Sequence, residues 1–381
     1  MDLCSTTVEA CDALSIQDRW REIVDEVKDE YLAENQRYPW IIGFSGGKDS
    51  TLVAQAVFEA LLDIPPSKRT RHVYIVSNDT LVESPLVIAH LNEVTSRIDQ
   101  AASGLGLPIT VARTVPDPDK TFWVLLIGKG YPSPNMTMRW CTDRLKIQPT
   151  SSYIRKYISE AGAAIVVLGV RRDESQTRQR SIDRQRNQRG SRLIEHKELP
   201  GAYIFRPIMD LLVDDVWEIL GYSHAPWGGN HSDLIRLYRD AAGGECPVVL
   251  SQEEAPGCGT SSSRFGCWTC TVVEKDKSLQ GFIDAGKHQY KPLVELRDWL
   301  RDIRNDPTRR QAIRRNGKLT FGAAGNHIPG PFTIQTRKEI LERLLKAQVD
   351  FGGELISHEE QDLIHEIWAH ELQKEKGAAD G

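Results

Sequence analysis

The sequence predicts an α/β protein in which a doubly wound parallel sheet is followed by a mainly helical part. Over the first half, apolar runs of strand length alternate with segments of helical spacing, which is typical of a parallel sheet covered on both faces. Polar clusters follow three of these runs, where ligands bind in such sheets. After about residue 210, strand signals fade and helical periodicity dominates. We therefore expect a loose tail at 1–15, a sheet domain at 16–210 and a helical region at 211–381.

The sheet domain is predicted to open with an amphipathic helix at 17–36, where apolar residues recur three and four positions apart. Four apolar runs then predict buried strands, at 40–44, 71–80, 108–112 and 163–170. Segments of helical spacing begin near residues 52 and 84, so that helices separate the strands. This order is the alternation that a parallel sheet requires.

The region after residue 210 is predicted to consist mainly of helices. Helical spacing occurs near 213–221, 231–241, 291–305, 335–348 and 358–375. A Gly- and Cys-rich segment, 243–270, lies between them, and we expect it to be an insert that binds a metal.

Bulk properties limit the class of protein. The 381 residues are 40% hydrophobic and 27% charged, as in a soluble globular chain, and no apolar run reaches the length of a membrane span. The start lacks the features of a secretory signal, so we expect a cytoplasmic protein with no membrane partner. The net charge of −5 disfavours a generally basic nucleic-acid coat, so DNA contacts would need local basic patches. In a reducing compartment, seven cysteines indicate metal binding or catalysis more than disulfides.

The most informative segment follows the first predicted strand. It contains two glycines that allow a tight turn, a lysine, and hydroxyl groups at the start of a helix, all of which suit phosphate. The spacing differs from that of the common G-x-x-x-x-G-K-[ST] loop. It matches the S-G-G-x-D-S loop of the PP-loop ATP pyrophosphatases, which split ATP between its α- and β-phosphates. An ordinary glycine-rich turn is the alternative. The expected nucleotide-binding residues are Ser45, Gly46, Gly47, Lys48, Asp49, Ser50, Thr51 and Asp79.

Asp79 and two arginines complete the predicted catalytic edge. Asp79 follows the second strand, where its carboxylate would hold Mg²⁺ or bond to ribose; a helix cap before Pro85 is the alternative. Its match to the Asp-Thr position of PP-loop enzymes favours a functional role. Arg171 and Arg172 follow the fourth strand and are expected to grip phosphate oxygens, so that with Lys48 and Asp49 they form the catalytic set.

An arginine-rich stretch follows at 178–192, with few apolar residues. It predicts a loop that meets a polyanion, either DNA or the triphosphate, and a solvated charge run is the alternative. The candidate DNA-binding residues are Arg184, Arg186 and Arg189. A second basic segment, 301–318, is a weaker candidate for the same surface.

The cysteines form the second informative pattern. Cys258 is followed by the pair Cys267 and Cys270, and a C-x-x-C pair can bind either zinc or one edge of an iron–sulfur cluster. Cys141 and Cys246 are the possible fourth ligands; Cys246 is left out as a buried small hydrophobic residue. Spacing alone leaves zinc and a cluster open, with a redox dithiol less favoured.

Several segments together resemble a known family. Residues 45–50, 141–149 and 169–175 resemble the phosphoadenylylsulfate (PAPS) reductase family in order and spacing. With residues 266–276 added, the chain is similar to the DndC/SspD proteins of DNA phosphorothioation. The resemblance implies an adenine nucleotide alpha hydrolase-like fold, ATP pyrophosphatase activity and a 4Fe–4S cluster, with sulfur from a partner cysteine desulfurase. It places the cluster ligands at Cys141, Cys258, Cys267 and Cys270, and the nucleotide phosphates at 45–50.

Two departures from the reductases matter. Reductases with a cluster usually carry a Cys-Cys pair where this chain has Trp140-Cys141, and they use a C-terminal cysteine nucleophile that this chain lacks. We therefore expect a sulfurtransferase that uses ATP and Mg²⁺ to activate a DNA backbone phosphate, working with other phosphorothioation proteins in a restriction-modification defence. The alternatives are an adenylyl-sulfate or PAPS reductase-like enzyme on a small nucleotide, and a zinc-stabilised DNA-binding scaffold subunit.

Overall fold

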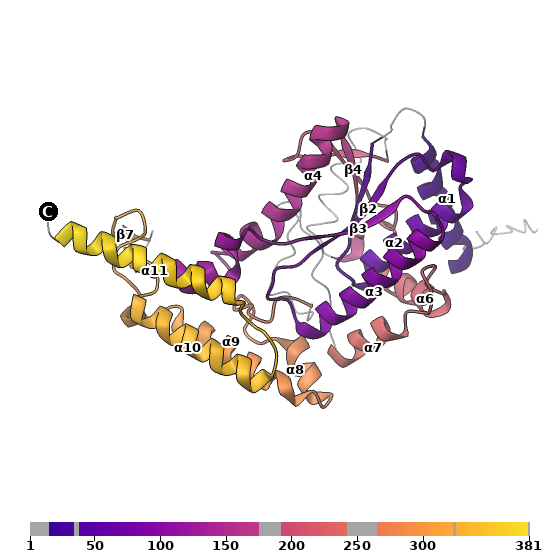
Figure 1. The fold of residues 1–381 in the computed structure, drawn as a ribbon. Coiled ribbons are helices and arrows are strands. Elements are labelled where there is room, and N and C mark those ends of the chain that lie inside the picture. Colours follow the sequence, from indigo (N-terminus) through magenta and orange to yellow (C-terminus); the bar gives the residue numbers. More distant parts are fainter. Residues whose placement is uncertain (1–14, 34–37, 175–191, 242–264, 323–324, 380–381) are drawn as a thin grey trace, which may run out of the picture.

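The computed structural model describes residues 15–33, 38–174, 192–241, 265–322 and 325–379. Figure 1 shows a sheet flanked by helices, joined to a group of helices from the second half of the chain. The predicted α/β class with a mainly helical C-terminal part is confirmed. No helix within the described ranges is long and apolar enough to span a membrane.

Within the described residues the main sheet has six strands in the order β3-β2-β1-β4-β6-β5. Their bounds are β1 (Trp40–Gly43), β2 (Val73–Asn78), β3 (Ile109–Thr114), β4 (Ala164–Val167), β5 (Ile194–Glu195) and β6 (Ala202–Phe205). Neighbouring strands are parallel except for β5, which pairs antiparallel with β6 at one edge. The four predicted strands match β1 to β4, whereas β5 and β6 were not predicted.

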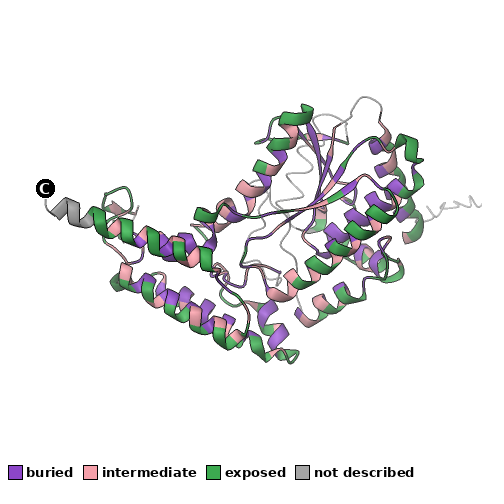
Figure 2. Cartoon of the chain, in the orientation of Figure 1, coloured by how far each residue is buried: buried purple, intermediate pink, exposed green. Residues whose placement is uncertain are grey.

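The sheet is buried on both faces, which explains why its strands are continuous apolar runs. Successive residues of β1 illustrate this, because side chains alternate between the faces of a strand. Ile42 packs with α1 (Ile16–Leu32) and α2 (Lys48–Asp63), while Ile41 packs with Ile154 of α4 (Gln148–Ala161). The central strands β1, β2 and β4 are accordingly mostly purple in Figure 2, whereas the edge strand β3 is partly exposed and the outer helix faces are green.

The remaining helices complete the two parts. They are α3 (Pro85–Gly104), α6 (Val213–Tyr222), α7 (Ser232–Ala241), α8 (Lys277–Asp284), α9 (Lys291–Ile303), α10 (Ile334–Phe351) and α11 (His358–Ala379). A short hairpin, β7 (Thr320–Phe321) with β8 (His327–Ile328), lies between α9 and α10. The domain boundary near residue 210 stays a prediction, and α6, just beyond it, packs against α1 and α2.

The C-terminal helices are anchored to the segment that leaves β3. This segment includes the π-helical turn η3 (Val124–Gly128). Trp123 Nε1 donates to Leu355 O at 2.7 Å, and Trp368 Nε1 donates to Ile127 O at 3.0 Å. Both indole groups are buried, so the two bonds fix α11 and the turn before it on this segment. The C-terminal helices therefore pack near the carboxyl ends of the strands.

Candidate active site

The loop after β1 turns the chain into α2 and is held in shape by its own hydroxyl groups. Phe44 N donates to Val76 O at 2.8 Å, which extends the strand pairing to the first residue of the loop. Ser45 Oγ lies 3.1 Å from Ser50 Oγ, and Ser50 Oγ donates to Gly47 O at 3.0 Å. The predicted phosphate loop therefore has a defined shape fixed by local contacts.

Glycines let other backbone segments approach this loop closely. Gly46 has φ +75°, and a Cβ there would lie 3.1 Å from Leu91 Cδ1. Gly169, just after β4, packs on the first turn of α2, where a Cβ would lie 2.8 Å from the carbonyl carbon and oxygen of Asp49. At the N-cap of α2, Gly47 supplies no side-chain cap, so the first-turn N–H groups and the helix dipole favour an anion there. This is the geometry of a phosphate site at a helix start.

A buried chain of charges joins this loop to the residues after β4. Lys48 Nζ pairs with Asp49 Oδ2 at 2.6 Å, and Arg171 Nε pairs with Asp49 Oδ1 at 2.5 Å. Arg171 Nη1 also pairs with Asp173 Oδ1 at 2.5 Å, and the side chains of Asp49 and Arg171 are only 4% and 3% exposed. Burial lowers the pKa of the Arg171 guanidinium, but the two carboxylates outweigh it and leave this pKa above its ordinary value. The network holds the loop and the β4 end together.

The two predicted phosphate-gripping arginines are thus placed differently. The guanidinium of Arg171 is directed at carboxylates inside the protein, which makes it a brace of the loop. Arg172 lies beside it, with Nε 3.1 Å from Asp210 Oδ1 and its backbone N bonded to Met209 O. Its side chain is 28% exposed, so it is the more accessible of the two.

Tyr238, on α7, reaches the same loop and was not identified from the sequence. Its hydroxyl accepts a hydrogen bond from Lys48 N at 3.4 Å, and its ring centroid lies 5.7 Å from Lys48 Nζ. The ring therefore stabilises the ammonium group through a cation–π contact. Lys48 and Tyr238 are 190 positions apart, so no local sequence signal links them.

A buried histidine supports α2 from behind. His231 Nε2 lies 2.8 Å from Gln55 Oε1, and Gln55 Nε2 donates to Glu59 Oε1 at 2.7 Å. Burial, together with the neighbouring His90, lowers the pKa of His231 to about 4. The imidazole is therefore neutral at neutral pH, and its protonation would oppose the fold.

Asp79 braces a turn rather than capping a helix. Its Oδ1 accepts from Leu81 N at 2.8 Å, and its Oδ2 lies 3.4 Å from Arg113 Nη1. Leu81 has φ +64°, an uncommon conformation that this bond helps to hold. Burial raises the pKa of Asp79, although the Leu81 N–H and Arg113 oppose the rise. Both carboxylate oxygens thus have protein partners, which weighs against Asp79 as a strong Mg²⁺ ligand.

The cysteine pair docks on this same turn. Cys267 forms a β-bridge with Glu83, and Trp268 N donates to Val82 O at 3.0 Å. Cys267 Sγ lies 3.4 Å from Thr80 Oγ1 and 3.6 Å from Glu83 Oε1. The Cys267–Cys270 pair is therefore attached to the carboxyl end of β2, at the edge of the sheet that carries the predicted phosphate loop.

Cys141 begins a second segment that meets the same carboxylate. It directly precedes the π-helical turn η4 (Thr142–Ile147). Within this turn, Lys146 Nζ lies 3.2 Å from Glu83 Oε1, the oxygen that also contacts Cys267 Sγ. Cys141 therefore lies within about two helical turns of Lys146, at a rise of roughly 1.5 Å per residue along the helix. The Cys141 and Cys267 segments are thus neighbours through Glu83.

Arginines of α9 hold the backbone that follows the cysteine pair. Arg297 is fully buried and donates to the carbonyl groups of Cys270, Val273 and Glu274. Arg304 donates to Thr271 O. Burial lowers the pKa of Arg304, as do Arg301 and Arg297, while Cys270 opposes the shift. Asp298 pairs with Arg297 and Arg301, and Asp302 pairs with Arg301, so these carboxylates offset part of the positive charge beside the segment. The charge that is left suits thiolates or an anionic cluster.

The described cysteines match a 4Fe–4S cluster in chemistry but not in spacing. The described donors are three thiols, two of them in a C-x-x-C turn closed by Cys270 N donating to Cys267 O at 3.0 Å. Their chemistry and positive surroundings fit a cluster. Within the described ranges, however, no three His, Cys, Asp or Glu side chains are gathered closely enough to hold a metal ion. The predicted fourth ligand, Cys258, and the excluded Cys246 lie outside the described residues.

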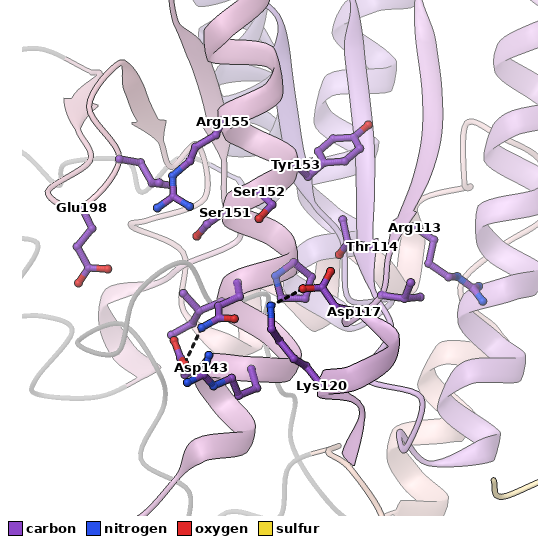
Figure 3. Close-up of a pocket in the computed structure, with 16 residues that line it drawn as sticks. Arg113, Thr114, Asp117, Lys120, Asp143, Ser151, Ser152, Tyr153, Arg155 and Glu198 are labelled. Carbon is purple, nitrogen blue, oxygen red and sulfur yellow. Dashed lines mark hydrogen bonds and ion pairs between the residues drawn. The ribbon is translucent and has the colours of Figure 1, made fainter. Parts of the chain in front are cut away.

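A cavity of about 690 Å³ opens beyond the end of β3 (Figure 3). In Figure 3, Arg155 and Glu198 lie on one side of it and Arg113 on the other, with the Arg113 guanidinium turned away toward Asp79 and Asn92. Lys120 pairs with Asp117 at 2.5 Å within it. The side chains that line the cavity carry charges of both signs. One of them, Arg113, pairs with Asp79, so the cavity adjoins the polar residues at the carboxyl ends of the strands.

The predicted DNA-binding residues Arg184, Arg186 and Arg189 lie outside the described residues. The second basic segment is described, and much of it makes intramolecular contacts. Arg301 and Arg304 hold the cysteine-rich backbone, Arg309 pairs with Glu339 at 2.6 Å, and Arg310 donates to Gly330 O at 2.6 Å. Only the later part of that segment is left for outside contacts.

Comparison with known families identifies one match. The family model described as the phosphoadenosine phosphosulfate reductase domain matches residues 39–273, which include both the phosphate loop and the cysteine segment. A curated relative, an uncharacterized protein of Methanocaldococcus jannaschii, is 29% identical over 261 residues. That match covers 66% of this chain and 53% of the relative, so the chain spans about half the length of the relative.

Solved structures resemble the chain only distantly. A phosphoadenylyl-sulfate reductase of Candida auris is 13% identical with a TM-score of 0.33, covering 56% of this chain and 88% of that one. A U34-tRNA thiolase of Methanococcus maripaludis, solved with its 4Fe–4S cluster, is 10% identical with a TM-score of 0.32, covering 76% and 81%. The NH3-dependent NAD synthetase of Campylobacter jejuni is 14% identical with a TM-score of 0.33, covering 55% and 74%.

Proposed function

Because the chain belongs to the family of the phosphoadenosine phosphosulfate reductase domain, we propose that it is an ATP pyrophosphatase that activates a DNA backbone phosphate for replacement of a nonbridging oxygen by sulfur. The observation that carries the proposal is the joining of two sites at one edge of the sheet. The phosphate loop follows β1, and Cys267 sits against Thr80 and Glu83 just after β2, the neighbouring strand. A nucleotide site and a thiol site side by side suit activation followed by sulfur transfer.

The reaction has two balanced steps. A nonbridging oxygen of the DNA phosphate attacks the α-phosphorus of ATP, and the bond to pyrophosphate breaks. A sulfur nucleophile at the oxidation level of sulfide then attacks the DNA phosphorus, so that a P–S bond forms and AMP leaves with the oxygen. Activation is needed because an unmodified phosphodiester oxygen is a very poor leaving group, whereas AMP leaves readily.

The protein's own groups stabilise the charges that develop in the first step. The first-turn N–H groups of α2 and the Lys48 ammonium bind the phosphates of ATP, which arrives as its Mg²⁺ complex. Asp49 and Arg171 act from behind as positioning residues, since both are buried and paired with each other. Arg172, which is more exposed, is the arginine that reaches the departing pyrophosphate.

The sulfur-transfer step suggests a role for the cysteines. We infer that Cys141, Cys258, Cys267 and Cys270 hold a 4Fe–4S cluster, which when bound would supply an iron site for sulfur. The positive charge of the α9 arginines stabilises the ligating thiolates. The sulfur comes from a partner cysteine desulfurase as a persulfide, and a thiol reductant supplies the two electrons that bring it to the oxidation level of sulfide before it attacks. Other phosphorothioation proteins act with this chain.

An adenylyl-sulfate or PAPS reductase-like activity is the second candidate, and the family match favours it. Residues 271–381 contain no cysteine, whereas those reductases are expected to use a cysteine nucleophile near their C-terminus. A zinc-stabilised scaffold is the third candidate, and it predicts no turnover of ATP.

The identity of the products tests the proposal. Anaerobically purified protein incubated with ATP, Mg²⁺ and DNA should release AMP and pyrophosphate. Lys48→Ala should lower this rate about a hundredfold or more, because an ammonium aimed at developing charge is lost. Lys68→Ala, at an exposed lysine of the 3-10 turn Pro66–Lys68, is the matched control and should keep the rate. Release of ADP and phosphate would contradict the assignment of the loop.

A further inference from the structure

The hairpin between α9 and α10 has an unusual composition for this chain. Residues 307–338 contain no Asp or Glu, although 53 of the 381 residues are acidic and the net charge is −5. The same stretch carries several arginines and lysines. We call residues 311–322 and 325–328 the arm. An acid-free basic segment in an acidic protein attracts a polyanion to one place on the surface.

The base of the arm is fixed. Arg310 and Phe332 form a β-bridge, and Phe332 is fully buried. Phe332 N donates to Gly130 O at 2.7 Å, which attaches the base to the segment leading to Cys141. Arg310 donates to carbonyl groups inside the base, and burial, together with Arg314, lowers the pKa of Arg310 to about 10. These contacts hold the arm at one position.

The rest of the arm is open to solvent. In Figure 1, β7 lies on a loop that stands beside α11, and Figure 2 shows the same loop mostly green and pink. Three apolar side chains on it are exposed: Ile313 by 50%, Leu319 by 58% and Phe321 by 61%. Single exposed apolar residues are common, but three on one short hairpin form a patch that suits contact with a partner.

Basic side chains flank this patch. Among the described residues, neither Arg314 nor Lys318 has a side-chain hydrogen bond or ion pair, so both charges are available to a ligand. Arg315 instead donates to Lys129 O at 2.8 Å and stacks 5.3 Å from the Tyr131 ring centroid, which ties the arm to its support. Arg314 N donates to Lys318 O at 2.9 Å, so the two cations stand on one turn of the arm. Phe321 follows three positions later, with its ring centroid 5.8 Å from that of His327.

We propose that the arm binds DNA, with Arg314 and Lys318 on backbone phosphates and Phe321 against the face of an unpaired or partly unstacked base. This inference rests on the proposed function, which makes DNA the substrate. A cation pair beside an exposed ring is the combination that holds single-stranded nucleic acid. An acidic protein surface would satisfy the charges but would give Phe321 no base to stack on.

The position of the arm suits this role. Arg315 and Phe332 attach it to residues 129–131, and the chain from there to Cys141 spans at most about 35 Å when extended. This is about one turn of a DNA duplex. The attachment points of the arm and Cys141 are therefore no farther apart than about one duplex turn, a distance that a short DNA can span.

Fluorescence anisotropy with the full chain tests the arm. The probes are a labelled single-stranded oligonucleotide and its duplex, measured over a range of salt concentrations. Arg314→Ala with Lys318→Ala should reduce the slope of log affinity against log salt by about 2 on the duplex. Phe321→Ala should weaken single-strand binding about tenfold without changing the slope. The control is Arg21→Ala with Lys68→Ala, which removes two charges from exposed sites on α1 and the Pro66–Lys68 turn, and it should leave both values unchanged.

The outcomes separate this inference from the proposed function. If the wild type binds DNA and both arm variants bind with the same affinity and slope, the arm proposal is overturned while the substrate assignment stands. If the arm variants lose binding as expected but the wild type makes no phosphorothioate, the arm stands and the chemistry fails. A wild-type protein that binds neither probe overturns both. A variant that instead loses only the capture of a purified acidic protein overturns the choice of DNA.

Discussion

Substituting alanine for Gly169 should damage the phosphate loop more than the fold. Gly169 lies after β4 with its backbone against the first turn of α2, and its φ is not positive, so Gly169→Ala tests space alone. The added Cβ would lie 2.8 Å from the carbonyl carbon and oxygen of Asp49 and 3.0 Å from Ser50 N. Since these are backbone atoms, the contact can be relieved only by moving β4 and α2 apart.

The size of the effect follows from the distances. Ordinary contacts begin at about 3.4 Å, so the two segments must separate by at least about half an ångström. Overpacking of this kind costs about 1–3 kcal/mol of the free energy of unfolding. A shift approaching 1 Å in a group that positions substrate can cost about a hundredfold in rate. We therefore expect Gly169→Ala to lower ATP turnover at least about tenfold in a protein that remains folded at 25 °C.

The assay combines chemical denaturation with AMP release. Gly221→Ala is the matched control, because Gly221 lies in α6 and a Cβ there meets nothing within 4 Å. It should keep full turnover and raise the free energy of unfolding by up to about 1 kcal/mol, since alanine favours a helix over glycine. Wild-type turnover in Gly169→Ala would refute the claim that the β4 end positions the loop.

Three further predictions follow from the same site. Asp49→Ala should lower the free energy of unfolding by about 3–5 kcal/mol, because it leaves Arg171 buried without its main partner, and adding Arg171→Met should restore part of this loss in urea melts. The free energy of unfolding should fall by roughly 3 kcal/mol as the pH drops from about 6.5 to 4. The reason is that the pKa of His231 is near 6.5 in the unfolded chain and about 4 in the folded protein. This contribution to stability is therefore present above pH 6.5 and lost on acidification. His231→Gln should flatten that dependence, whereas His370→Gln on exposed α11 should not. Serine at any one of the four predicted cluster ligands (Cys141, Cys258, Cys267, Cys270) should abolish the iron content and visible absorption of anaerobic protein, while Cys246→Ser retains both. Stoichiometric zinc without iron would contradict this last prediction.

Local signals explain what could be predicted from the sequence. Strands β1 to β4 are apolar runs bounded by polar residues, and each is long enough to register as a strand. Strand β6 has four residues, as β1 and β4 do, but it follows the arginine-rich stretch, which carries no helical pattern to mark a strand after it. Strand β5 has two residues, too few for a recognisable period. The pairing of β6 with β4, and of β5 with β6, is a tertiary contact. The antiparallel edge was therefore not predicted.

The residues of the candidate site also fall into those with a local sequence signal and those without one. The phosphate loop is a contiguous motif, so its residues could be named from spacing alone. Asp49 and Arg171 are 122 positions apart, so no local pattern indicates that the arginine turns inward to the aspartate. Tyr238 and the bracing arginine Arg297 were missed for the same reason, since each acts through a backbone or ring contact with a distant segment. Packing decides these roles.

The most direct test follows the oxygen atom. DNA carrying a heavy oxygen isotope at its nonbridging phosphate positions is incubated with the protein, ATP, Mg²⁺ and the sulfur-donating partner. If sulfur displaces AMP from an adenylylated DNA phosphate, the AMP released must carry one heavy oxygen, and mass spectrometry of the digested DNA must show a matching amount of phosphorothioate. Unlabelled AMP, formed at the same rate with or without DNA, would contradict the account by showing that ATP is cleaved without activation of the DNA phosphate.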